Sequence, residues 1–192
     1  GFIMNRQRAT NALNMSLFGS APLYDGVHVA MGNNADFDFG ASTDFTVSLW
    51  AKYTDDGYMG LVSKGVGGVD GGWEVIVNSS TGKLQGRIEK ADGSAMVNTI
   101  SGSEYNDGEW HNFVVVFDRS ANMTVYIDKV ADGNQSISAI GDCDADHSLI
   151  IGKQSTLNYP FNGEIDDVLI YNRVLSLPEI TRNYNAGKRS HR

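Results

Sequence analysis

Two carboxylates in the stretch from Phe161 to Arg173 are the first residues that could do chemistry. Asp166 and Asp167 interrupt a run that is otherwise apolar on both faces of an expected strand. A carboxylate in such a strand needs a partner, because burying it unpaired is costly. A bound cation and a set of backbone N–H groups are the two alternatives for Asp166, and Asp167 is expected to be solvated or salt-bridged.

A second acidic segment, Asp142 to Asp146, has the Asp-x-Asp-x-Asp opening of a calcium loop. An EF-hand loop would also need Gly at its sixth position and Glu at its twelfth. His147 and Lys153 stand there instead. The sequence therefore favours a solvated acidic turn over an EF-hand-like site.

The glycine-rich segment from Gly65 to Gly72 is followed by an expected strand and not by a helix. A phosphate-binding loop needs a helix N-terminus directed at the anion, so a nucleotide site is excluded. A loop on the rim of the fold is expected instead, and such loops often carry binding function. The four histidines and Cys143 show no spacing typical of a catalytic nucleophile, so no catalytic residue is predicted.

Aromatic residues in loops are candidates for binding sugars, which stack on ring faces while amides and carboxylates take the hydroxyl groups. The candidate ligand-binding residues are Tyr58, Trp73 and Tyr159, with Asp70 and Asn158 as polar neighbours. The alternative for any one ring is burial at an end of the fold, which is the commoner fate of aromatic residues. Tyr58 and Tyr159 stand in polar stretches, so exposure is expected first for these two.

Composition limits the classes of protein to consider. The chain has 192 residues, 41% of them hydrophobic, which favours a single globular domain with a real core. The formal net charge of −8 argues against nucleic acid or an anionic membrane as a partner. One cysteine allows no internal disulfide, and no apolar run approaches membrane-spanning length.

Short segments with period-two alternation are expected to position the candidate residues. Phe45 to Tyr53 is the clearest, and about a dozen such strands, spaced roughly 8 to 12 residues apart, indicate an all-β sandwich or barrel. Strict alternation in the closing strand puts Val168 and Ile170 on one face, and Ile165 with Leu169 and Tyr171 on the other.

One short helix is expected after the closing strand. Ser176 and Glu179 have the spacing of a capping box, so the helix should begin directly after Ser176. Residues 1–12 are expected to form an N-terminal arm, residues 13–187 a single domain, and residues 188–192 a tail.

A set of short segments occurs in a characteristic order along the chain: 44–52, 61–65, 107–111, 115–118, 125–128, 149–152 and 161–173, followed by 175–180. Taken in this order, they resemble the laminin-G-like and concanavalin A-like lectin/glucanase family. The resemblance covers residues 24 to 185 and implies a two-sheet antiparallel jelly-roll β-sandwich. One departure is Lys129, where the family usually has Gly.

The resemblance also implies a structural calcium ion in many relatives. The Asp of the closing strand supplies a carboxylate there, and backbone carbonyls of an early loop supply further ligands. In this sequence those positions are Asp166 and the turn containing Asp25 and Gly26. Oxygen ligands suit Ca²⁺.

Glu164-Ile-Asp166 is similar to the opening of the catalytic strand of family 16 glucanases. Retaining hydrolysis needs two carboxylates about 5 Å apart. The second Glu would fall at Val168 or Leu169, which are apolar, so the sequence argues against an enzyme of this type.

These observations predict a non-catalytic binding module of an extracellular or cell-surface protein, with a glycan or a surface protein as its ligand. The glycan is favoured, and this step rests on analogy with the family. The first alternative is a structural or protein-interaction domain of a larger enzyme or adhesin, which should show an apolar patch. The second is a hydrolase or lyase that uses an unrecognised set of residues.

Overall fold

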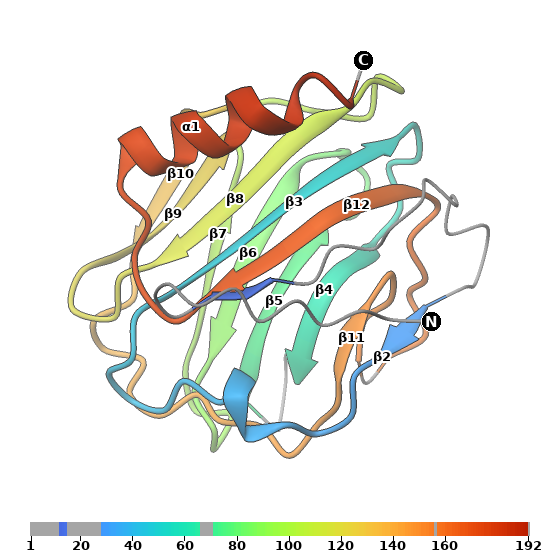
Figure 1. Ribbon diagram of the computed structural model, residues 1–192. Helices are drawn as coiled ribbons and strands as arrows, with labels where there is room; N and C mark the ends of the chain where they lie inside the picture. Colours follow the sequence, from blue (N-terminus) through green and yellow to red (C-terminus); the bar gives the residue numbers. More distant parts are fainter. Residues whose placement is uncertain (1–11, 15–27, 66–70, 156, 192) are drawn as a thin grey trace.

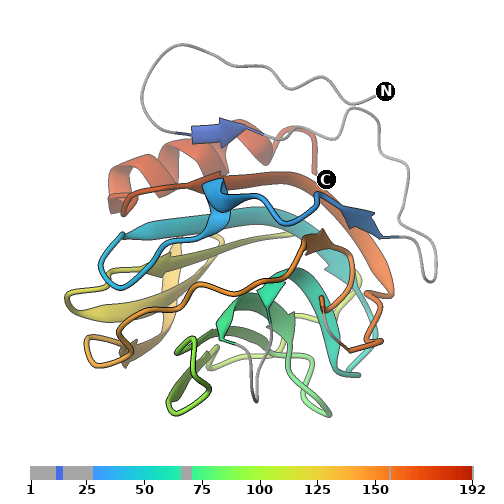
Figure 2. The same cartoon turned by 90° about the horizontal axis from the view of Figure 1, so that it is seen from below.

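The protein is a sandwich of two antiparallel sheets with one helix on the outside (Figures 1 and 2). A computed structural model describes residues 12–14, 28–65, 71–155 and 157–191. The predicted all-β jelly-roll class, with a short helix near the C-terminus, is confirmed.

Among the described residues, each sheet has six strands. The β3 sheet runs in the order β1 (Ala12–Asn14), β12 (Gly163–Tyr171), β3 (Phe45–Tyr53), β8 (His111–Phe117), β9 (Asn122–Ile127) and β10 (Val130–Ser136). The β5 sheet runs in the order β2 (Val29–Ala30), β11 (Leu149–Ile151), β4 (Met59–Gly65), β5 (Gly72–Val77), β6 (Leu84–Glu89) and β7 (Met96–Ile100). A 3₁₀ turn, η1 (Ala35–Phe37), precedes β3, and α1 (Leu177–Gly187) follows β12.

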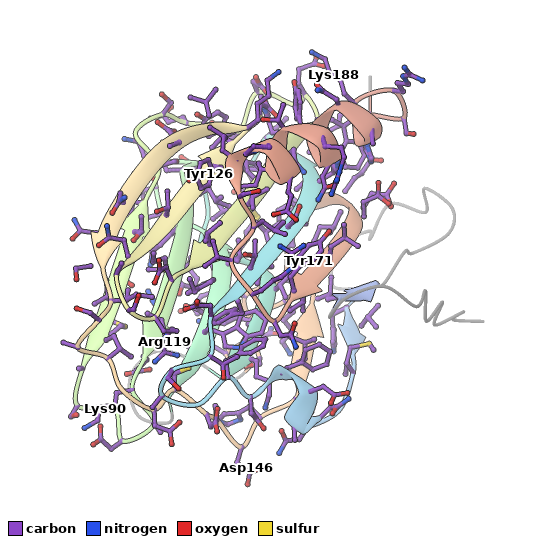
Figure 3. All side chains as sticks on the ribbon, turned by 60° about the vertical axis from the view of Figure 1, so that its left-hand side comes forward. Lys90, Arg119, Tyr126, Asp146, Tyr171 and Lys188 are labelled. Carbon is purple, nitrogen blue, oxygen red and sulfur yellow. The ribbon has the colours of Figure 1, made fainter. Side chains whose placement is uncertain are left out.

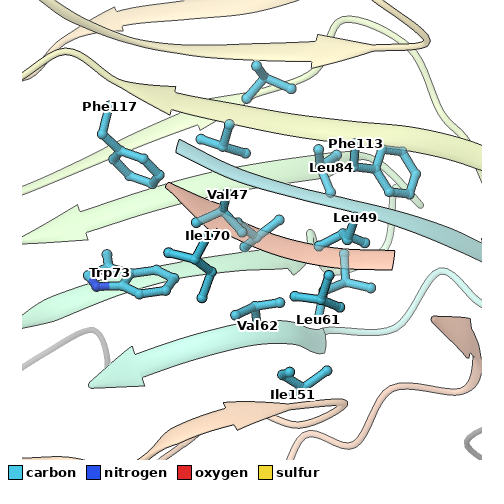
Figure 4. Packing of buried hydrophobic residues seen from close by; sticks show 14 of the residues in the cluster. Val47, Leu49, Leu61, Val62, Trp73, Leu84, Phe113, Phe117, Ile151 and Ile170 are labelled. Carbon is cyan, nitrogen blue, oxygen red and sulfur yellow. The ribbon is translucent and has the colours of Figure 1, made fainter. Parts of the chain in front are cut away.

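The core lies between the two sheets because each strand directs alternate side chains inward (Figure 4). Phe45 stacks between Phe39 and Phe117, with ring centroids 4.1 Å apart in both pairs. Trp73 packs against the first two of these rings and donates its indole N–H to the carbonyl of Phe37 at 3.1 Å. This aromatic group fills one end of the sandwich.

A β-bulge in β12 breaks the alternation that the sequence suggests. Asp166 pairs with Trp50 and Leu169 with Ser48, so β12 has one residue more than β3 over this interval. The extra residue is Asp167, whose φ of 47° lies in the left-handed region. Ile165 consequently lies in the core with Val168 and Ile170, and its predicted position on the opposite face was wrong.

The helix α1 covers part of the outer face of the β3 sheet (Figures 1 and 3). The capping box is confirmed, since the backbone N–H of Ser176 donates to Glu179 Oε2 at 2.9 Å. Ile180 packs with Val114 and Val116, which β8 directs away from the core. Tyr126 and Tyr171 pack around the same contact.

After the helix, the chain returns to the β3 sheet. His191 is 6% exposed and stacks on Trp50, with ring centroids 4.4 Å apart. Its Nε2 lies 3.1 Å from Asp166 Oδ2, and Nδ1 lies 2.9 Å from the carbonyl of Gly187. The residues that follow α1 therefore contact the same strand as the bulge.

A buried ammonium group joins the loops at one end of the sandwich. Lys64 is 1% exposed, and its Nζ donates to Asn33 Oδ1 and to the carbonyl oxygens of Ala145 and His147 at 2.8 to 2.9 Å. These bonds use its three protons, so Asp38 Oδ1, 2.8 Å away, acts as the counter-charge. One cation thus holds oxygens from the loop before β3 and from the loop before β11.

Replacing Lys64 by Met should destabilise the fold by about 3–5 kcal/mol, because it leaves the buried Oδ1 of Asp38 without its counter-charge and three oxygens without their hydrogen-bond donor. Urea denaturation measures this change. The matched control is Lys90→Met, which removes an exposed ion pair with Asp92 and should leave the unfolding midpoint unchanged. Equal effects of the two substitutions would contradict the role assigned to Lys64.

Candidate functional site

The outer face of the β5 sheet is partly covered by residues 152–155 and 157–161. The backbone N–H groups of Gly60 and Gln154 both donate to the carbonyl of Tyr159, at 3.1 and 3.3 Å. A Cβ at position 60 would lie 2.2 Å from the backbone nitrogen of Gln154. Glycine is therefore required in β4, because the covering segment lies directly on the strand.

A buried carboxylate lies beneath this segment. Trp73 and Val75 point into the core, so the intervening Glu74 points to the outer face, yet its side chain is only 1% exposed. Arg87 Nη1 lies 2.7 Å from Glu74 Oε1. The hydroxyl of Tyr58 donates to Oε1 at 3.1 Å, and Gln154 Nε2 donates to Oε2 at 2.9 Å.

The network extends sideways across β6 and β7. Arg87 Nε donates to Asn98 Oδ1 at 2.9 Å, and Gln85 Nε2 donates to the same oxygen at 3.1 Å. Asn78 in turn donates to Gln85 Oε1 at 2.6 Å. Polar side chains from β5, β6, β7 and the covering segment are thus held in one arrangement.

The charges of this network perturb each other. Burial raises the pKa of the Glu74 carboxyl above its ordinary value of 4.5, and the guanidinium of Arg87 opposes part of that shift. Burial also raises the pKa of the Tyr58 hydroxyl, and the negative charge of Glu74 adds to the effect. Tyr58 therefore stays protonated and serves as a hydrogen-bond donor.

Two tyrosines border the network toward solvent. Tyr58 and Tyr159 meet edge to face with centroids 4.8 Å apart, and the Arg87 guanidinium lies 5.8 Å from the centroid of the Tyr58 ring. Tyr159 is 41% exposed, and Leu157 and Asn158 beside it are also exposed. An accessible ring next to fixed amide and guanidinium donors is an arrangement that can hold a hydroxylated ligand.

Of the five predicted ligand-binding residues, the structure brings three together at the outer face of the β5 sheet. Tyr58, Asn158 and Tyr159 lie together at this face. Trp73 lies in the core and is 2% exposed, so its prediction as a ligand contact was wrong, because its strand turns the ring inward. Asp70 is outside the described residues.

Sequence reasoning missed Glu74, Arg87 and Gln154. The signal was present for the first two, since each is a charged residue inside a strand that is otherwise mostly apolar or uncharged. Their pairing depends on the register of β5 with β6, which aligns Glu74 with Arg87. Gln154 comes from a loop, and no pattern in the sequence places it there.

Of the three residues predicted to bind calcium, only Asp166 is among those that the structure describes. Asp166 Oδ1 accepts the backbone N–H of Asp167, and Oδ2 lies near His191, so both oxygens have contacts. Asp25 and Gly26 lie outside the described residues, and the calcium site stays a prediction. Within residues 12–14, 28–65, 71–155 and 157–191, no three His, Cys, Asp or Glu side chains form a group that could hold a metal.

The acidic turn has a local role. Asp144 Oδ1 accepts the backbone N–H of Gly40 at 2.6 Å, and Asp142 Oδ1 accepts that of Asp144 at 3.0 Å. These bonds tie the turn to the loop before β3, close to the oxygens that surround Lys64. The turn thus belongs to the group of loops that Lys64 joins, which we call the Lys64 loop cluster: the loop before β3 and the loop before β11.

The two antiparallel sheets and the single covering helix define a jelly-roll β-sandwich. Residues 24–181 match the family described as the concanavalin A-like lectin/glucanases superfamily, and the chain belongs to it. No curated protein matches the sequence. In the part of the chain that the structure describes, no helix is long and apolar enough to cross a membrane.

Solved structures of toxin binding domains share the fold. The binding domain of Paraclostridial Mosquitocidal Protein 1 is 16% identical with a TM-score of 0.70, over 93% of this chain and 47% of that one. The binding domain of botulinum neurotoxin serotype D is 15% identical with a TM-score of 0.68, over 96% of this chain and 50% of that one. The chain spans about half the length of these domains.

A further structure is that of the botulinum neurotoxin serotype D ligand-binding domain in complex with N-acetylneuraminic acid. It is 17% identical with a TM-score of 0.63, over 97% of this chain and 44% of that one. At this level of identity the likeness shows the fold alone.

Replacing Glu74 by Gln gives a test of the buried charge. Because the folded protein raises the pKa of Glu74 above 4.5, the folded state binds more protons than the unfolded state above that pH. The stability of the parent should therefore fall relative to Glu74→Gln as the pH rises from about 4.5 toward neutral. Urea denaturation of both proteins between pH 4 and 8 measures the difference.

A difference that stays flat, or that grows in favour of the parent as the pH rises, would contradict this. The latter result would mean that the attraction of Arg87 outweighs the cost of burying the carboxylate.

Proposed function

We propose that the chain is a non-catalytic carbohydrate-binding module of an extracellular or cell-surface protein. Membership of a lectin/glucanase superfamily and similarity to toxin binding domains support a binding role. One of those toxin domains is in complex with a sialic acid, which makes sialylated glycans a sensible part of any ligand panel. Similarity to toxin binding domains also supports the proposed location outside the cell.

The observation that carries the proposal is the exposed Tyr159 ring beside a fixed polar network. A sugar offers a face of C–H groups to an aromatic ring and hydroxyl groups to neighbouring donors and acceptors. Arg87 and Asn98 lie on the same sheet face as Tyr58, and their hydrogen bonds hold them in place before a ligand arrives. Such preorganisation reduces the entropy lost on binding.

Binding is favoured over hydrolysis because the Glu74 carboxylate is already satisfied. It accepts two hydrogen bonds and pairs with Arg87, which leaves it poorly placed to exchange a proton with a substrate. Glu89 lies on β6, on the same outer face as Arg87. Its negative charge is a further cause of the raised pKa of the Glu74 carboxyl. Retaining hydrolysis would need one carboxyl free to act as acid and the other as nucleophile.

The alternative is a protein-interaction domain. Met96 and Ile100, both more than 40% exposed, lie on β7 on either side of Asn98. These side chains would contribute apolar area to a protein contact at the same face. A broad glycan panel separates the two proposals, because only the first expects a sugar to bind.

Tyr159→Ala should weaken glycan binding about tenfold, because it removes the exposed stacking ring while the Glu74 network stays intact. Titration calorimetry against neutral and sialylated oligosaccharides measures the affinity. Leu177→Ala is the matched control, since Leu177 is 52% exposed but lies on α1 at the other sheet. Absence of binding across the panel, or release of reducing ends from any polysaccharide, would overturn the proposal.

We also propose a structural Ca²⁺ held by Asp166 with the turn at Asp25 and Gly26, as the family resemblance implies. Removing calcium with a chelator should then lower the melting temperature, and added calcium should restore it. Scanning calorimetry measures both. Asp166→Ala should abolish the response to calcium, and a melting temperature that ignores chelator and calcium would show that the metal is absent.

A further inference from the structure

A hollow with both polar and apolar walls lies on the opposite side of the molecule from the proposed glycan face. It occupies about 360 Å³ between α1 and the outer face of the β3 sheet. This volume falls near the lower end of the range for small-molecule sites, roughly 300–1,000 Å³. Its walls are formed by Ser48 and Trp50 of β3, Asn112 of β8, Asp167 and Leu169 of β12, residues 183, 186 and 187 of α1, and Ser190.

Asn112 lies in this wall with an unsatisfied acceptor. The residue is 3% exposed, and its Nδ2 donates to the carbonyl of Leu49 at 3.1 Å. Its Oδ1 is buried and has no hydrogen-bond partner among the described residues. An unpaired buried acceptor is unfavourable, and a donor from a ligand would satisfy it once a small rotation of the amide turns Oδ1 toward the hollow.

Asp167 adds a second acceptor with a negative charge. It is the extra residue of the β12 bulge, and its left-handed φ of 47° directs the backbone out of the regular strand. No hydrogen bond from a described residue reaches its carboxyl group. The carboxylate of Asp166 has a partner of its own, since its Oδ2 lies 3.1 Å from Nε2 of His191.

The chemistry of the lining defines the ligand. An unpaired amide oxygen and a partly desolvated carboxylate both call for hydrogen-bond donors, and the carboxylate favours a positive charge. The hydroxyl groups of Ser48 and Ser190 can accept or donate. A ligand with one ammonium and several hydroxyl groups satisfies all four groups.

We propose that this hollow binds a small polyhydroxylated primary amine, such as an amino-sugar derivative, with its ammonium at Asp167 and a hydroxyl donating to Asn112. The site is separate from the Tyr159 face and does not depend on the function proposed there. Because α1 forms one wall, bound ligand should also stabilise the attachment of the helix to the sheet.

The test compares two probes that differ in one group, 1-amino-1-deoxyglucitol and glucitol, in 0.15 M salt. Calorimetry and the NMR signal of the Trp50 indole N–H report binding in the hollow. The amine should bind at least about tenfold more tightly than the neutral polyol, as expected for a charge-assisted hydrogen bond. Asp167→Asn should abolish this preference, and Asn tolerates the left-handed backbone, so the variant should fold.

Two further variants make the test specific. Ala186→Leu fills the hollow from the exposed side of α1 and should block both probes. Tyr159→Ala and Asp92→Asn should leave amine binding unchanged, because the first lies at the other face and the second is an exposed carboxylate elsewhere. Absence of binding to the parent would overturn the proposal, as would an amine preference that survives in Asp167→Asn.

Discussion

The burial of the Glu74 carboxylate constrains the whole outer face of the β5 sheet. A charge with almost no exposed surface is tolerated only if its oxygens are paired, and here the partners come from three places in the chain. Arg87 is supplied by the neighbouring strand, Tyr58 by the approach to β4, and Gln154 by the segment that covers Gly60. Satisfying one charge therefore fixes that segment, and the segment positions Tyr159 at the surface.

The same principle acts at two other places in the fold. Lys64 joins the loops before β3 and β11 through three hydrogen bonds and an ion pair. Its positive charge is surrounded by oxygen atoms from both loops. The bulge in β12 leaves Asp166 facing His191 and Asp167 facing the hollow under α1. The loops around Lys64 and the bulge in β12 thus each contain charged side chains held by specific partners, while the core between the sheets is apolar.

The fold could be predicted from the sequence because it depends on local patterns. Alternation in Phe45–Tyr53 and the Ser176–Glu179 capping box both act within a few residues, and both are confirmed. The site could be predicted only in part. Tyr58 and Tyr159 stand in polar stretches, which indicated exposure, but Trp73 was wrong because one residue of register decides which face a strand residue occupies. The partners of Glu74 depend on pairing between strands and on a loop crossing, which no local pattern encodes.

The central claim is that the Glu74 network holds the covering segment on β4. Hydrogen exchange measures this most directly, because the amides of Gly60 and Gln154 both donate to the Tyr159 carbonyl. In Glu74→Ala both amides should lose protection, while the Leu149 amide, which donates to Gly32 in the Lys64 loop cluster, should keep it. Unchanged protection of Gly60 and Gln154 would contradict the account, because the segment would then be held without the buried charge.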